Sequence, residues 1–141
     1  MTIEKSTLLP CGQAQAFALF TEAIAEWWPP ERRHLPDPSS TIVLDPTRFF
    51  ERDSHGKEVE LGRVLEWVAP ERLVLDWYPG TGPDQPTRVT IRFVPESDHT
   101  RVLVEHGPTP ASADLFEARA DRYRASWDLV LKSLRGALDR Q

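Results

Sequence analysis

The side chains that most often carry catalysis or bind metals are few and scattered in this sequence. The four histidines are His34, His55, His99 and His106. No two of them stand at metal-ligand spacing, and a structural zinc site usually takes four His or Cys ligands. The single Cys11 has no histidine near it in the sequence, and there is no G-x-S-x-G motif. We therefore expect no metal, no cofactor and no catalytic nucleophile.

Two polar residues fall at positions of the predicted strands where the alternation places inward-facing, apolar side chains. Arg63 lies two residues from both Leu61 and Leu65, so its guanidinium points inward if the strand is regular. A β-bulge at Gly62 would turn Arg63 to solvent instead, because glycine often marks bulges. His106 also falls in an inward phase. It is either a cavity residue that contacts a ligand or acts as acid or base, or a histidine at the sheet rim bonded to backbone.

The elements that must position these residues begin with a set of strands. From residue 41 onward, apolar and polar residues alternate in short runs separated by turns. The runs predict strands at 41–44 and 48–52 and near 59–67, 73–77, 88–93 and 102–106. Connections of turn length predict antiparallel neighbours, because parallel pairs need crossovers of about a dozen residues or more.

Two further segments follow the helical period. The first begins after Glu4, includes Ala14, Phe17 and Ile24, and ends at Trp27 and Trp28, where two prolines follow. Neighbours on a helix point about 100° apart, so we expect one indole to pack and the other to edge a cavity mouth or the proline-rich loop at 29–40. That loop is long enough to serve as a lid. The second segment, 116–138, carries an apolar and aromatic face that needs the dry face of a sheet to cover it.

Length and charge narrow the classes of protein. The 141 residues suit one domain spanning 1–141. A net charge of −5 and a pI near 5.4 argue against nucleic acid as a partner, because phosphate binding needs a basic surface. No apolar run approaches the roughly 20 residues that cross a bilayer. One cysteine and no secretory signal favour the reducing cytoplasm.

Several segments together resemble a known group of proteins. They are AFALFT at 16–21, WWP at 27–29, GRVLEW at 62–67 and PERLVLDW at 70–77, and the pattern of Tyr123, Ser126, Trp127, Leu131 and Leu134 also fits. The sequence resembles the SRPBCC (START-like) superfamily over nearly its whole length. Within that superfamily it is most similar to proteins related to the activator of the heat-shock-protein-ninety ATPase.

The resemblance implies one START-like domain with an α+β helix-grip fold. This fold has a curved antiparallel sheet of about seven strands, two short helices after the first strand, and a long C-terminal helix. Between sheet and helix the superfamily generally encloses a cavity. Members use it for lipids, sterols, polyketides or plant hormones, some catalyse cyclisation in it, and some act as co-chaperones.

We expect a cavity of this kind to be lined by inward-facing side chains of the sheet and helices. The candidates are Trp28, Phe49, Arg63, Leu65, Trp67, Trp77, Ile91, Phe93, Val104, His106, Tyr123 and Trp127. The same aromatic residues are also what an ordinary core contains. A pocket lined by them with a few polar groups would be the usual form of a small-molecule site.

The leading hypothesis is a non-catalytic protein, monomer or homodimer, that binds a small, largely hydrophobic molecule. One alternative is a stress-related co-chaperone-like module that contacts a chaperone or another protein. It predicts an exposed apolar patch on the outer sheet face, where Val64, Val74 and Leu103 fall. The other is a cyclase or aromatase in which His106 acts as acid or base and Arg63 holds an anionic intermediate.

Overall fold

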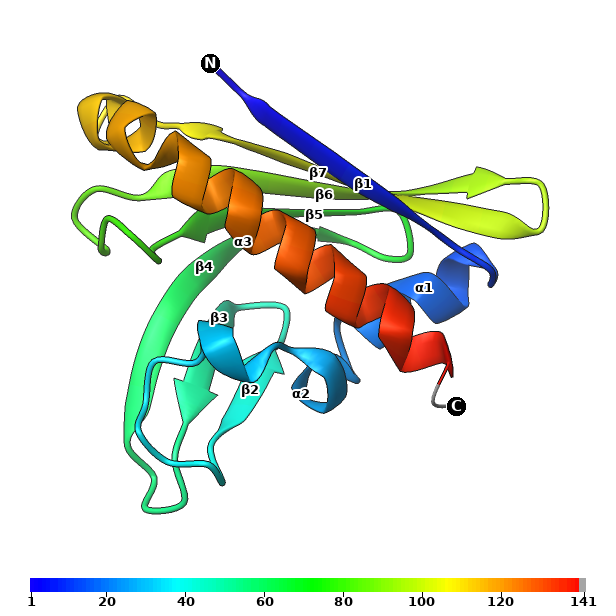
Figure 1. Cartoon of the computed structure of the whole chain (residues 1–141), viewed down its shortest axis with the longest axis horizontal. Helices are drawn as coiled ribbons and strands as arrows, with labels where there is room; N and C mark the ends of the chain where they lie inside the picture. The colour runs from blue at the N-terminus through cyan, green and yellow to red at the C-terminus, as the bar shows by residue number, and fades with distance from the viewer. Residues whose placement is uncertain (140–141) are drawn as a thin grey trace.

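The computed structural model describes residues 1–139 as an α+β fold in which a seven-stranded antiparallel sheet curls around a long helix (Figure 1). The strands are β1 (Ile3–Leu9), β2 (Thr41–Leu44), β3 (Arg48–Arg52), β4 (Glu58–Val68), β5 (Arg72–Trp77), β6 (Thr87–Glu96) and β7 (His99–Pro108). The helices are α1 (Gln13–Phe20), α2 (Ile24–Trp27), the short 3-10 helix η1 (Pro30–Arg32) and α3 (Ala113–Asp139). The predicted helix-grip fold is confirmed.

The sheet has the strand order β1-β7-β6-β5-β4-β3-β2. From β2 to β7 each strand pairs with the next one along the chain, as the turn-length connections predict. The first strand pairs with the last, with Ile3 opposite His106 and Leu9 opposite Thr100. Figure 1 shows β4 bending strongly, so that β2 and β3 turn toward α2 while β5, β6 and β7 lie beneath α3.

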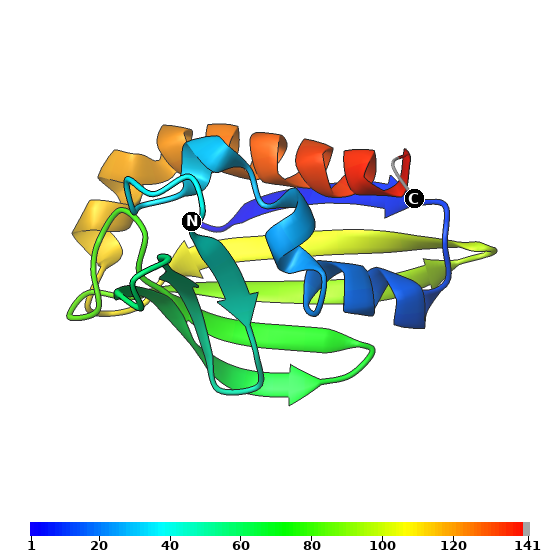
Figure 2. The ribbon, with the colours of Figure 1, turned by 90° about the horizontal axis from the view of Figure 1, so that it is seen from below.

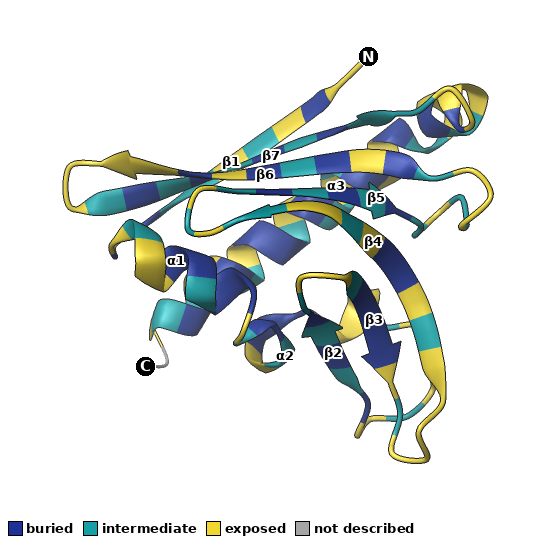
Figure 3. Ribbon diagram, turned by 180° about the vertical axis from the view of Figure 1, so that it is seen from behind, coloured by how far each residue is buried: buried dark blue, intermediate teal, exposed yellow. Residues whose placement is uncertain are grey.

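Helix α3 covers the concave face of the sheet, and the short helices lie on the same side (Figure 2). Its buried residues repeat at intervals of three and four, as the sequence predicts. On β5 and β7 every second side chain is buried, which gives the alternation visible in Figure 3. Within residues 1–139, no helix combines the length and the apolar character that crossing a membrane requires.

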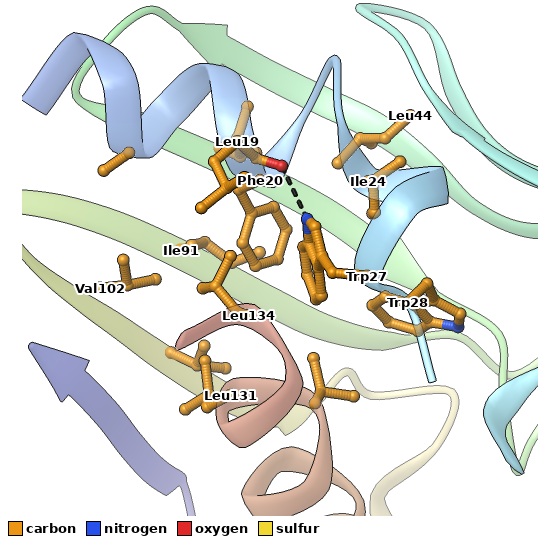
Figure 4. Close-up of a cluster of buried hydrophobic side chains, with 14 of the residues drawn as sticks. Leu19, Phe20, Ile24, Trp27, Trp28, Leu44, Ile91, Val102, Leu131 and Leu134 are labelled. Atoms are coloured by element: carbon orange, nitrogen blue, oxygen red, sulfur yellow. Dashed lines mark hydrogen bonds between the residues drawn. The ribbon is translucent and has the colours of Figure 1, made fainter. Parts of the chain in front are cut away.

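The early segment contains a strand and two helices, where the helical period alone predicted a single helical stretch. Residues Ile3–Leu9 are extended because they pair with β7 along their whole length. Helix α1 ends at Phe20, and the indole N–H of Trp27 donates to the carbonyl oxygen of Leu19 at 2.7 Å, which ties α2 to α1. Figure 4 shows this bond and shows the Trp28 indole directed to another side. The arrangement agrees with what the family resemblance implies.

A first bulge in β4 changes the predicted phase of this strand. The pairing with β3 shifts register so that Leu61 has no residue opposite it, and Leu61 and Gly62 are both buried. A β-carbon at Gly62 would lie 2.5 Å from the carbonyl oxygen of Asp76, so only glycine fits this approach. Beyond the bulge Arg63 is exposed. The prediction that Arg63 points inward is therefore wrong, and the bulge alternative is correct.

A second shift of register, opposite β5, leaves Leu65 without a partner residue. Leu65 is 41% exposed, whereas Val64 and Trp67 pack against the core. The prediction that Leu65 lines the interior is wrong, and so is the placement of Val64 on the outer face. Each extra residue inverts the alternation that follows it, because side chains of a strand change face at every residue.

Candidate functional site

A cavity of about 230 Å³ opens between the loop that follows α2 and the middle of α3. Residues of β4, the end of β5 and the loop after β5 complete its walls. Its apolar lining consists of Trp28, Leu61, Trp77, Tyr123, Trp127 and Val130. Its polar rim consists of Glu31, Arg32, Arg33, His34, Arg119 and Arg122. The site therefore combines an apolar interior with a charged opening.

The large rings of the apolar lining are in contact with one another. The ring centroid of Trp77 lies 5.1 Å from that of Trp127 and 6.3 Å from that of Trp28. Phe49 stacks on Trp77 at 5.1 Å and supports it from within the core. Aromatic rings packed in offset and edge-on arrangements form a stable apolar surface. Such a surface can bind a flat apolar or aromatic molecule.

His106 is completely buried beside this aromatic lining. The indole N–H of Trp127 donates to Nδ1 of His106 at 3.0 Å. Because an indole nitrogen only donates, Nδ1 is the unprotonated ring nitrogen and Nε2 carries the hydrogen. Nε2 therefore donates to Oγ1 of Thr87 at 2.8 Å, and that hydroxyl donates to the carbonyl oxygen of Trp77 at 3.1 Å.

Both nitrogens of His106 are thus bonded to partners inside the protein. Burial lowers the pKa of His106 from its usual 6.5 to about 3, so the ring is neutral near pH 7. The ring faces inward, but it is not part of the cavity lining. This arrangement gives no support to His106 as a ligand contact or as an acid or base near neutral pH. It holds Trp127 and Trp77 in place instead.

One wall of the cavity is the loop between β5 and β6, which α3 holds. The hydroxyl of Tyr123 donates to the carbonyl oxygen of Pro79 at 2.9 Å, and Nε of Arg119 donates to that of Gly80 at 2.5 Å. Gly80 has a φ of +87°, and a β-carbon there would lie 2.8 Å from the Tyr123 hydroxyl. Burial raises the pKa of Tyr123, so the hydroxyl stays protonated as a donor.

The opposite wall is the loop after Trp28, and a buried carboxylate holds it. Glu51 on β3 is fully buried. It accepts hydrogen bonds from the backbone N–H groups of His34 at 2.7 Å and Leu35 at 3.2 Å, and from the hydroxyl of Ser40 at 2.7 Å. Charge-assisted bonds of this kind are about twice as strong as neutral ones. Glu51 therefore fixes the position of the rim residues that this loop carries.

Two further contacts restrain the same loop. Oδ2 of Asp37 accepts from the backbone N–H and the hydroxyl of Ser54, and these bonds lower the pKa of Asp37 to about 2. The guanidinium of Arg33 donates to the carbonyl oxygens of Ser40 at 2.6 Å and Ala25 at 3.4 Å. In this structure these bonds hold the loop, considered as a lid from the sequence, as one wall of the cavity.

The predicted cavity residues occupy four kinds of position. Trp28, Trp77, Tyr123 and Trp127 line the cavity. Phe49 and Ile91 line a narrower crevice beyond Trp28 and Trp77 that has no room for a water molecule. Trp67, Phe93 and Val104 pack in or against the core, and His106 lies beside Trp127. Arg63 and Leu65 are exposed on β4, as described above.

The polar rim and Ser126 are not among the cavity residues predicted from the sequence. Arg119, Arg122 and Ser126 follow one another at intervals of three and four, which places them along the same side of α3. That spacing was a usable signal. The loop residues had no comparable signal, because their position depends on Glu51, far along the chain. Within residues 1–139, no group of three or more His, Cys, Asp or Glu side chains is arranged to hold a metal ion.

Most of the chain matches one family of known protein sequences. The sequence model for the family described as "Activator of Hsp90 ATPase homolog 1-like protein" matches residues 11–139. No curated protein matches the chain significantly.

Solved structures with the same fold come from several bacteria. A protein from Mesorhizobium loti is 17% identical, with a TM-score of 0.66 over 100% of this chain and 98% of its own. One from Nitrosomonas europaea is 18% identical, with a TM-score of 0.67 over 99% and 95%. One from Rhizobium leguminosarum is 15% identical, with a TM-score of 0.69 over 100% and 95%. At these identities the likeness concerns the fold alone.

Proposed function

The chain belongs to the family of activator of Hsp90 ATPase homolog 1-like proteins, and we propose that it binds a small molecule with a hydrophobic body, without catalysing a reaction. The observation that carries the proposal is the cavity of about 230 Å³ lined by Trp28, Trp77, Tyr123 and Trp127. Cavities lined mainly by aromatic side chains, with a few polar groups, are the usual form of small-molecule sites.

The size of the cavity limits the ligand. Sites for drug-sized molecules usually measure about 300–1,000 Å³, and this one is smaller. Each water occupies about 30 Å³ in the liquid, so the cavity has the volume of roughly eight waters. A molecule of one or two rings or a short acyl chain suits that volume. A sterol or a long-chain lipid does not.

The binding experiment uses a panel that spans these sizes. Native mass spectrometry and calorimetry would follow one- and two-ring aromatics, short and long fatty acids, and a sterol. We expect binding of the small members and none of the sterol. Binding restricted to the sterol and long lipids, or no binding by any member, would overturn the proposal.

A pair of variants on α3 tests whether the cavity is the binding site. Ser126 lines the cavity and Ala125 beside it is exposed. Ser126→Phe fills the cavity with a ring, and Ala125→Phe adds the same ring to the surface. We expect the first substitution to abolish binding and the second to leave it unchanged. Equal binding by both variants would place the ligand elsewhere.

A co-chaperone-like interaction module is the second candidate, and its support is the family itself. The apolar patch expected for it on the outer sheet face is not present in residues 1–139. Val64 packs against the core, and Val74 and Leu103 are half-buried. The outer face carries ion pairs instead, such as Arg92 with Glu105 at 3.0 Å. A chaperone partner would have to bind a charged surface, and capture of a purified chaperone that weakens at high salt would support this candidate.

A further inference from the structure

The arginines of this chain differ in whether they have an acidic partner. Among the thirteen arginines in residues 1–139, seven form ion pairs with aspartate or glutamate, mostly on the outer side of the sheet. The other six form none with the residues that the structure describes, and they are Arg32, Arg33, Arg63, Arg119, Arg122 and Arg135. Four of these six belong to the polar rim of the cavity. The arginines without a carboxylate are thus concentrated at its opening.

The rim arginines stand on two opposite walls. Arg32 and Arg33 lie on the loop after Trp28, and Arg119 and Arg122 lie on α3. Arg33 and Arg119 donate to backbone carbonyl oxygens, so their guanidinium groups are held in place. Arg32 and Arg122 are exposed and make no side-chain hydrogen bond within residues 1–139.

The charge at this opening has the opposite sign to that of the chain. The protein has a formal net charge of −5, yet the described residues that line the opening include four arginines and one carboxylate, that of Glu31. Positive charges that gather without partners around an apolar cavity attract a negative group and orient it at the opening. The guanidinium group in particular matches a carboxylate, to which it can donate two parallel hydrogen bonds.

We propose that the ligand of this cavity is an aromatic carboxylate, with its ring against Trp77 and Trp127 and its carboxylate between Arg32 and Arg122. The inference rests on the proposed function, because it names the chemical class of the molecule bound there. The volume of about 230 Å³ suits one or two rings, and the carboxylate stays at the opening, where it keeps part of its hydration.

The test compares acids with neutral molecules of the same shape. Calorimetry would measure the binding of benzoate and 2-naphthoate against benzamide and 2-naphthamide near neutral pH. Ion pairs at exposed positions are individually weak, so the two arginines together should give the acid about 2- to 30-fold tighter binding. The preference should shrink as salt is raised from about 0.05 M to about 0.5 M, because the opening is exposed to solvent.

Three variants assign the effect to the two exposed arginines. Arg32→Gln and Arg122→Gln should each weaken acid binding, and the double variant should remove the preference for the acid over the amide. Arg63→Gln is the matched control, since Arg63 is also exposed and has no ion pair within residues 1–139, but lies on β4 away from the opening. It removes the same charge and should leave the preference intact.

The outcomes separate the two proposals. Equal affinity for acid and amide in the unchanged protein overturns the inference, while the cavity remains a binding site. The same preference in the double variant also overturns it. If none of the four probes binds, the hypothesis that the cavity binds an aromatic molecule is overturned, and the inference with it.

Discussion

The indole N–H of Trp127 donates to Nδ1 of His106 at 3.0 Å, and this bond selects one neutral tautomer of a fully buried imidazole. Protonation of His106 would place a hydrogen on Nδ1, facing a group that only donates, and would place a charge in the apolar interior. The hydrogen-bonded chain from Trp127 to the carbonyl of Trp77 therefore depends on His106 remaining neutral. It follows that the stability of the fold depends on pH.

The free energy of unfolding should fall as the pH drops from about 6.5 to about 4.5. The pKa of His106 is about 3 in the folded protein and near 6.5 in the unfolded chain. The unfolded chain therefore binds the proton first, and stability declines by about 1.4 kcal/mol per pH unit in this range. Above pH 6.5 this contribution is complete and constant. Urea unfolding at about pH 7.5, 6 and 5 measures the slope.

Two histidine variants control this measurement. His106→Gln offers an acceptor and a donor without titrating, so its slope should be flat between about pH 6.5 and 4.5, at the cost of some overall stability. His55→Gln removes an exposed histidine and should keep the slope of the unchanged protein. A persistent slope in the His106 variant would show that another group is responsible.

Replacement of Trp127 by phenylalanine tests the same hydrogen bond from its donor side. Trp127→Phe leaves Nδ1 of His106 buried without a partner and leaves space beside Trp77. We expect a loss of about 2–4 kcal/mol in the free energy of unfolding. In a double-mutant cycle with His106→Gln, the coupling should reach about 1 kcal/mol or more. The same cycle with Trp67→Phe, which does not contact His106, should show no coupling beyond experimental error.

The strands and the long helix were predictable where the pattern along the chain is unbroken. In β5, in β6 as far as Phe93 and in β7 as far as His106, every second side chain is buried, so period two identifies both the strand and its inner face. In β4 the alternation fails because Leu61 and Leu65 are extra residues with no partner opposite them. The position of such a residue depends on how β4 pairs with β3 and β5, which the sequence of β4 alone does not reveal. Gly62 was the one local sign of this irregularity.

The site was predictable only in part, for a related reason. Trp77, Tyr123 and Trp127 lie on elements with clear periods, so the sequence indicates that they face the interior. The rim depends on Glu51, which stands between Phe50 and the exposed Arg52 and whose charge predicts a surface position, yet it is fully buried. Two of its partners are backbone N–H groups of a distant loop, and a contact of this kind leaves no periodic pattern in the sequence.

Substitution of Gly62 should be costly because of the first bulge. In Gly62→Ala the new β-carbon would meet the carbonyl oxygen of Asp76 at 2.5 Å, and a backbone atom of a paired strand cannot move aside cheaply. We expect a loss of about 2 kcal/mol or more in the free energy of unfolding. Gly12→Ala is the control, since a β-carbon there meets nothing within 4 Å, and it should cost no more than about 1 kcal/mol. Equal effects in urea unfolding would contradict the steric account of the bulge.

Substitution of Glu51 should loosen the loop that carries one half of the rim. In Glu51→Gln an amide NH₂ replaces one acceptor oxygen, so a donor faces either the N–H of His34, or the N–H of Leu35 together with the hydroxyl of Ser40. We expect a loss of about 1–3 kcal/mol in stability. Hydrogen exchange of the 28–40 peptide should quicken by about tenfold or more, because the loop opens locally before the protein unfolds.

The exposed Glu71, changed to glutamine, provides the control for this variant. That substitution removes the same charge at a position without an ion pair in residues 1–139, and exchange of the loop should not change. Unaltered exchange in Glu51→Gln would mean that the loop is held mainly by Asp37 and Arg33, whose bonds to Ser54 and Ser40 the substitution leaves intact. Faster exchange confined to the Glu51 variant would identify this buried carboxylate as the group that positions Arg32 at the opening of the cavity.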